Sequence, residues 1–159
     1  MATVEVTFTP LPAHVRTARL VATAVARRSG VDESLLDEVR LAVGEACSRA
    51  VEAHQKHCPR QPIRVALSDD GERFEVVVTD AAPVDADGVS AVAAPAGGNG
   101  TAPGAALAHG AAEGSDVILQ LPAGVGLAVI SGLADDVRIL PADDGTSIVM
   151  SWKRRSPAA

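Results

Sequence analysis

The stretch VGEACSRAVEAH, residues 43–54, lies on a long helix that the sequence predicts. Glu45 and Arg49 stand on this helix one turn apart, at the flank of an apolar stripe. An exposed pair with this spacing is usually a surface ion pair that contributes roughly 0.3–0.5 kcal/mol. A functional interpretation of the same pair depends on the elements around the helix.

Hydrophobic periodicity places those elements on both sides of the helix. The helix begins after an N-cap at Asp32 and ends at Cys58-Pro59. Its apolar stripe consists of Leu36, Val39, Val43, Ala46 and Ala50. The other predicted elements are a strand at 4–8, a helix to about Arg28 that stops at Gly30, a hairpin of 63–67 and 74–78, a helical segment from Gly124, and two strands at 137–140 and 146–152.

The order β-α-α-β-β-(loop)-α-β-β predicts an α+β fold. We expect a two-layer sandwich with one mostly antiparallel sheet and helices on one face. A single domain would span residues 1–153. Residues 85–112 are rich in Ala, Gly and Pro and cannot offset their ordering entropy by burial, so this segment is predicted to be mobile. Residues 154–159 are predicted to form a disordered tail.

Composition excludes several classes of protein. Aromatic residues make up 2% of the chain, so the core must be aliphatic, and the net charge of −6 argues against a nucleic-acid binder. We find no secretory signal and no apolar stretch long enough to span a bilayer. Two cysteines give no disulfide framework and favour the cytoplasm. Motifs of serine hydrolases and P-loop proteins are absent.

A cluster at the end of the long helix permits two interpretations. His54, His57 and Cys58 lie close in sequence and near Cys47, which is an assortment that could hold zinc. The spacing matches no usual tetrahedral site. A polar helix terminus beside a buried Cys47 is the favoured alternative.

Four short motifs occur in order on these elements: "VGEACSRAVEAH", "VVVTDAAPVD", "GVGLAVISGLADDV" and "DDGTSIVMSW". Together they resemble the Bergerat-fold, or histidine-kinase-like, ATPases. Within that superfamily the sequence is most similar to the anti-sigma factor serine kinases of bacterial partner-switching systems. The resemblance covers residues 4–152. The residues at the positions of the family's nucleotide site are Glu45, Arg49, Asp80, Gly124, Gly126, Leu127 and Thr146.

The resemblance implies a role for each position, and three positions depart from it. In the family, a Glu is the general base, an Asn four residues later holds magnesium, and a strand-end Asp accepts the adenine amino proton. Here Arg49 replaces the Asn, and Ala82 and Val84 replace the glycines after Asp80. A guanidinium has no lone pair for Mg²⁺, and we expect it to pair with Glu45 and lower that carboxylate's basicity, or to contact phosphate. ATP binding stays open, magnesium is not expected, and kinase activity is expected to be weakened or lost.

The first helix carries a second resemblance. The segment "HVRTARL" puts Arg19 where the family has an arginine that contacts both the sigma factor and its antagonist, and Arg16 precedes it. The expected function is a cytoplasmic, homodimeric anti-sigma factor that sequesters a sigma factor and is itself captured by an antagonist protein. The alternatives are an active protein-serine kinase that phosphorylates the antagonist, and a scaffold without a sigma partner.

Overall fold

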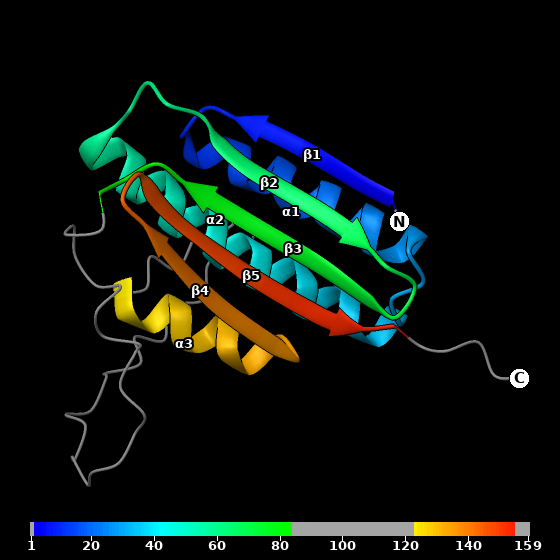
Figure 1. Cartoon of the computed structure of the whole chain (residues 1–159). Helices are drawn as coiled ribbons and strands as arrows, with labels where there is room; N and C mark the ends of the chain where they lie inside the picture. The colour runs from blue at the N-terminus through cyan, green and yellow to red at the C-terminus, as the bar shows by residue number, and fades with distance from the viewer. Residues whose placement is uncertain (1, 84–122, 155–159) are drawn as a thin grey trace, which may run out of the picture.

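The computed structural model describes residues 2–83 and 123–154, with side chains described from Leu127 onward in the second range (Figure 1). The predicted mobile segment at 85–112 and residues 155–159 of the predicted tail lie outside the described residues. The elements in chain order are β1 (Ala2–Phe8), α1 (Pro12–Arg28), the 3₁₀ helix η1 (Glu33–Leu35), α2 (Leu36–His57), β2 (Ile63–Asp69), β3 (Arg73–Asp80), α3 (Ala123–Leu133), β4 (Asp136–Ala142) and β5 (Gly145–Lys153).

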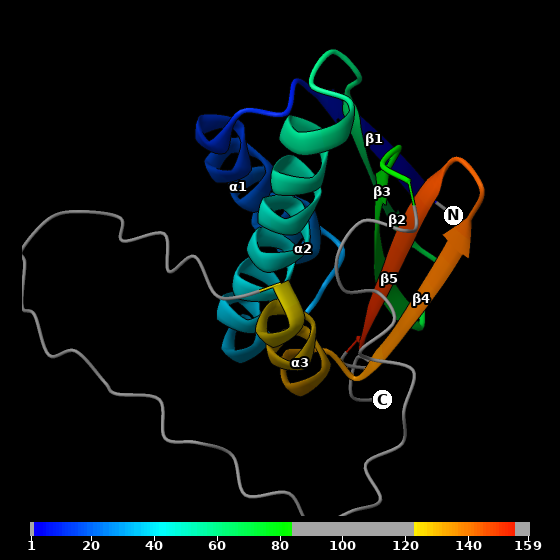
Figure 2. The ribbon, with the colours of Figure 1, turned by 90° about the vertical axis from the view of Figure 1, so that its left-hand side faces the viewer.

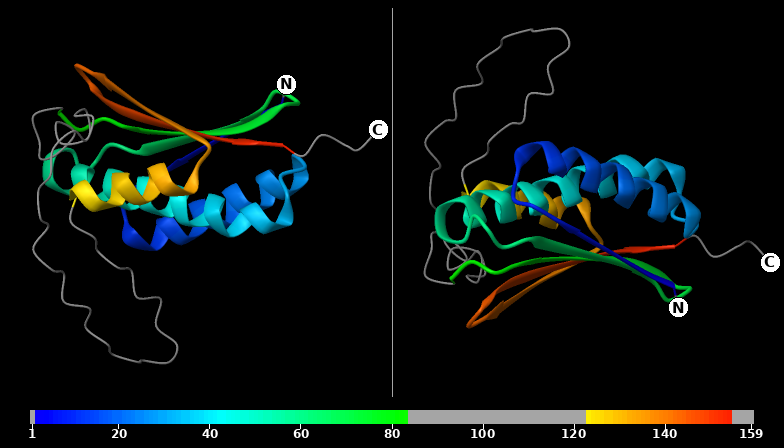
Figure 3. Two further views of the ribbon diagram at one scale, coloured as in Figure 1. Left: turned by 90° about the horizontal axis from the view of Figure 1, so that it is seen from below. Right: turned by 90° about the horizontal axis from the view of Figure 1, so that it is seen from above.

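The strands form one five-stranded sheet in the order β1-β2-β3-β5-β4, and every neighbouring pair is antiparallel. All three α-helices pack on the same face of this sheet, with α2 between α1 and α3 (Figures 1 and 2). Figure 3 shows the two layers edge-on. The predicted two-layer α+β sandwich is confirmed.

The core lies between these layers and is almost entirely aliphatic. Alternate residues of the three central strands face the helices, and α2 contributes a fully buried stripe opposite them. The buried strand residues include Ile63, Val65, Leu67, Phe74, Val76, Val78, Ile148, Met150 and Trp152. The Trp152 indole also donates a hydrogen bond of 2.9 Å to the carbonyl of Leu133, and so ties β5 to the end of α3.

The helix ends follow the expected chemistry with one difference. Gly30 has φ +83° and ends α1, as predicted. Asp32 does act as a cap, accepting from the Ser34 backbone N–H at 3.0 Å, but it caps η1 rather than α2. The chain therefore turns once as a 3₁₀ helix before α2 begins at Leu36. This difference arises because Asx side chains bond the backbone two residues on, whichever helix type follows.

The C-terminal end of β5 is fixed to the β2–β3 turn. Arg154, which the sequence assigned to the tail, donates its backbone N–H to the Glu72 carbonyl at 2.9 Å. Its guanidinium forms an ion pair of 2.9 Å with Asp69. The described chain thus stays attached to the sheet through this residue.

The tight turn between β4 and β5 depends on Gly145. This residue has φ +147°, and a Cβ added to it would collide with the backbone carbonyl of Asp80 at the end of β3. Only glycine permits this approach of the two backbones. The turn therefore brings Thr146 against Asp80, its register partner in the sheet.

We predict that Gly145→Ala lowers the free energy of unfolding by roughly 2–4 kcal/mol, because the methyl group adds a backbone collision to an unfavourable φ. The matched control is Gly71→Ala. Gly71 also has a positive φ, of +95°, but has nothing within 4 Å of an added Cβ. The control should lose only the conformational part, about 1–2 kcal/mol. Urea denaturation measures both variants, and equal losses would contradict the close approach at Gly145.

Candidate functional site

Asp80 lies at the centre of the predicted site. The residue is buried, with 5% of its surface exposed. One oxygen, Oδ1, accepts from the backbone N–H of Ala82 at 3.0 Å and from that of Thr146 at 3.3 Å. The other oxygen, Oδ2, accepts from Arg49 Nη1 at 3.3 Å. The carboxylate therefore joins α2, the residues after β3 and the start of β5.

The prediction that Arg49 pairs with Glu45 is wrong. Arg49 forms its ion pair with Asp80 instead, and the two side chains are 16% and 4% exposed. Two carboxylates are available to Arg49: Glu45, one turn away on the same helix, and Asp80, 31 residues away in sequence. The distant partner wins because a charge attraction strengthens as water is excluded from around it.

The predicted loss of basicity at Glu45 is also wrong. Glu45 is half-buried, and burial raises the pKa of its carboxyl. The positive charge that opposes this rise belongs to Arg19 on α1. Arg19 lies against Gly44, where an added Cβ would collide with its Nε. That Nε is buried and has no hydrogen-bond acceptor among the described residues.

His54 has a role that the sequence did not reveal. It is fully buried, its Nε2 accepts from the backbone N–H of Ala81 at 2.8 Å, and its Nδ1 lies 2.9 Å from the Gln61 carbonyl. Because Nε2 is an acceptor, Nδ1 carries the hydrogen and donates it to Gln61. His54 continues the apolar stripe at four-residue spacing from Ala50, which was the available signal that it is buried.

The zinc interpretation of this region does not fit the residues. Both ring nitrogens of His54 already bind backbone groups. Cys47 is fully buried, and burial raises the pKa of its thiol to about 12. In residues 2–83 and 123–154 we find no group of three or more His, Cys, Asp or Glu side chains that could hold a metal.

The remaining predicted site residues lie in different surroundings. Thr146 is buried beside Asp80. Gly124 and Gly126 fall in the first turn of α3, and the side chain of Leu127 is 1% exposed in the core. Arg16 is exposed on α1. The structure thus brings together Arg49, Asp80 and Thr146, while Arg16 belongs to another face.

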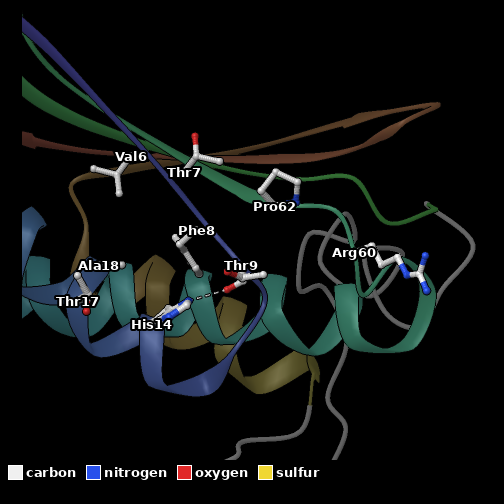
Figure 4. A pocket seen from close by; sticks show the side chains of 9 residues that line it. All are labelled: Val6, Thr7, Phe8, Thr9, His14, Thr17, Ala18, Arg60 and Pro62. Carbon is white, nitrogen blue, oxygen red and sulfur yellow. Dashed lines mark hydrogen bonds between the residues drawn. The ribbon is translucent and has the colours of Figure 1, made fainter.

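A separate groove of about 490 Å³ lies between the end of β1, the first turns of α1 and the α2–β2 connection (Figure 4). Phe8 and His14 meet in it edge to face, and Thr17 and Arg60 line it further along. The groove contains none of the predicted nucleotide-site residues. Any ligand there would be independent of Asp80.

Comparisons with known proteins agree with this architecture. A family model described as the histidine kinase-like ATPase domain matches residues 8–152. The crystal structure of the RsbU and RsbW domains of Rv1364c from Mycobacterium tuberculosis is similar over 99% of this chain, with a TM-score of 0.64 and 18% identity. This chain spans 34% of that protein, and at this identity the likeness concerns the fold. No curated protein matches the chain.

In the described ranges, no helix combines the length and apolarity that crossing a membrane requires.

We predict that the free energy of unfolding of Glu45→Gln increases relative to that of the parent protein as pH rises from about 4 to about 7.5. The pKa of Glu45 is raised in the fold above its ordinary value of 4.5, so the folded state binds this proton more tightly than the unfolded chain. The resulting stability is complete below the ordinary value and is lost as pH rises through the folded value. Glutamine has no proton to lose.

Urea denaturation at both pH values measures the difference in free energy of unfolding between the two proteins. Glu52→Gln, at an exposed position on the same helix, controls for helix propensity. Its exposed ion pair with Lys56 should contribute little to stability. A difference that stays constant with pH would contradict the effect of burial on Glu45.

Proposed function

Because the chain belongs to the histidine kinase-like ATPase family, we propose that it is an anti-sigma factor of a bacterial partner-switching system. In this role it sequesters a sigma factor and is itself captured by an anti-sigma factor antagonist. We place it in the cytoplasm as a homodimer. The proposal rests on the resemblance of its motifs to anti-sigma factor serine kinases and on the surface of α1.

The observation that carries the proposal is the charge and exposure of α1. This helix contains four arginines and no acidic residue, in a chain whose net charge is −6. Leu20 is 62% exposed, and Arg16 lies one turn before it. Arginine is enriched at protein interfaces and among their hot spots, so the arginines of α1 support an interface on this helix. A partner with an acidic and apolar surface fits this helix.

Arg19 is the second arginine of α1 that the proposal assigns to partner binding. Its Nε is buried against Gly44 and lacks an acceptor among the described residues. A partner cannot reach this buried nitrogen, but Arg19 as a whole is only half-buried. We propose that a partner carboxylate or carbonyl pairs with the accessible part of the guanidinium, since such charged hydrogen bonds are strong. The resemblance implies that sigma factor and antagonist both contact Arg19, so we propose that they bind one at a time.

The kinase reaction of the family is proposed to be weakened or lost. Magnesium neutralises developing charge and aligns the transferred phosphoryl group. The guanidinium of Arg49, where the family has a metal-ligating Asn, can neither coordinate Mg²⁺ nor accept a proton. Asp80 already accepts three of the roughly four hydrogen bonds that an ionised carboxylate can accept, and the residue is buried. The residues present do not fit a magnesium–nucleotide complex of the family's type.

The second candidate is an active protein-serine kinase with Glu45 as the general base. The raised pKa of Glu45 is the observation in its favour, since a more basic carboxylate accepts a proton more readily. Incubation with purified antagonist, magnesium and labelled ATP separates the two functions. We expect no phosphate transfer. Transfer that disappears in Glu45→Ala would establish the kinase instead.

We predict that Leu20→Ala and Arg19→Gln each weaken partner binding by about tenfold or more, because both remove contacts near the centre of the proposed interface. The measurement is the affinity of the full chain for each purified sigma factor of the host and for its antagonist. Arg64→Gln is the matched control, since Arg64 is an exposed arginine on β2, outside α1.

Leu20→Ala removes exposed surface from a helix without lowering helix propensity, so it should fold normally. Circular dichroism before and after heating checks this. Unchanged affinity in both α1 variants, or no binding of any sigma factor by the parent protein, would contradict the proposal.

A further inference from the structure

We infer that Arg49 is an internal ligand of Asp80, and that it occupies the acceptor oxygen which an adenine amino group would need. The family's nucleotide site has thereby become a structural clamp. The clamp consists of Arg49, Asp80 and the backbone N–H groups of Ala82 and Thr146. It belongs to the free protein and does not depend on which partner α1 binds.

The hydrogen-bonding capacity of Asp80 is the first reason. Both backbone donors are directed at Oδ1, so Oδ2 is the oxygen left to receive a donor from the cleft. Arg49 Nη1 reaches that oxygen at 3.3 Å. The residue is 5% exposed, so little of the carboxylate remains for any group arriving from solvent.

Charge is the second reason. An adenine amino group is neutral, whereas the guanidinium is a permanent cation. A base that displaced Arg49 would leave a nearly buried carboxylate without its counter-charge, together with a mostly buried guanidinium. Breaking such a pair from one side is strongly unfavourable. A neutral donor therefore competes poorly for this oxygen.

The surroundings of Asp80 are the third reason, because they hold its backbone in place. Gly145 packs against the Asp80 carbonyl from the β4–β5 turn. His54 fixes the next residue through the Ala81 N–H. Turning the carboxylate away from Arg49 would also break its bonds to the backbone N–H groups of Ala82 and Thr146. Its position suits joining three segments.

A double-mutant cycle tests the clamp. Arg49→Gln and Asp80→Asn are made singly and together, and the unfolding equilibrium constant of each is obtained from urea denaturation. Asparagine keeps an acceptor for the two backbone N–H groups and removes the charge. We expect each single variant to be less stable and the pair to be coupled by about fivefold or more in the unfolding constant.

The matched control is the cycle of Arg40→Gln and Asp37→Asn. This pair lies on the same helix at 2.9 Å, but its side chains are 52% and 81% exposed. We expect coupling below about twofold for the control. Additive effects of Arg49→Gln and Asp80→Asn, or coupling no larger than in the control, would overturn the inference.

Nucleotide titration of the unaltered protein provides a second test that does not rely on a change in stability. Calorimetry of the unaltered full chain with ATP and with adenosine, each with and without magnesium, should give no binding tighter than about millimolar. Submillimolar binding that is lost in a folded Asp80→Asn variant would show that the carboxylate still receives adenine, and the inference would fail. Such a result would leave sigma-factor binding through α1 untouched.

Discussion

A carboxylate buried at the end of β3 requires compensation, and the segments that provide it define this end of the molecule. Asp80 receives one charged and two backbone donors, from α2, from the residues after β3 and from β5. Removing a carboxylate from water costs several kcal/mol unless such partners are present. Gly145 lets the β4–β5 turn come close enough to contribute one of them. The close approach of the β4–β5 turn at Gly145 thus helps to compensate the buried charge of Asp80.

Periodicity predicted the fold because it records which side of each element is buried. The strands of the sheet alternate and the stripe on α2 follows helical spacing, so the strands and α-helices appear where the pattern predicts them, while the short 3₁₀ helix η1 was not predicted. The site was harder to predict because its contacts join positions far apart in the chain. Spacing along α2 suggested Glu45 for Arg49, whereas folding offers Asp80, a more deeply buried carboxylate. His54 was overlooked because its bonds go to backbone groups of other segments.

The two arginines near this site interact with different acidic groups from those that the sequence suggested. Arg49 compensates Asp80, and Arg19 approaches Glu45 from α1 across the bare backbone of Gly44. The absence of a side chain at Gly44 matters because any Cβ there would displace the guanidinium. The positive charge that acts on Glu45 therefore comes from Arg19 on α1 and not from Arg49 on its own helix. Arg19 of α1 therefore lies close to Glu45, the position that the resemblance assigns to the general base.

The arginines of α1 also bear on how a partner would approach this helix. Arg27 of α1 pairs with Glu33, whereas Arg16 and Arg28 are exposed. In a chain of net charge −6, these two exposed arginines would attract an acidic partner toward the helix. Once bound, a partner carboxylate on Arg19 would compete with Glu45 for the same cation.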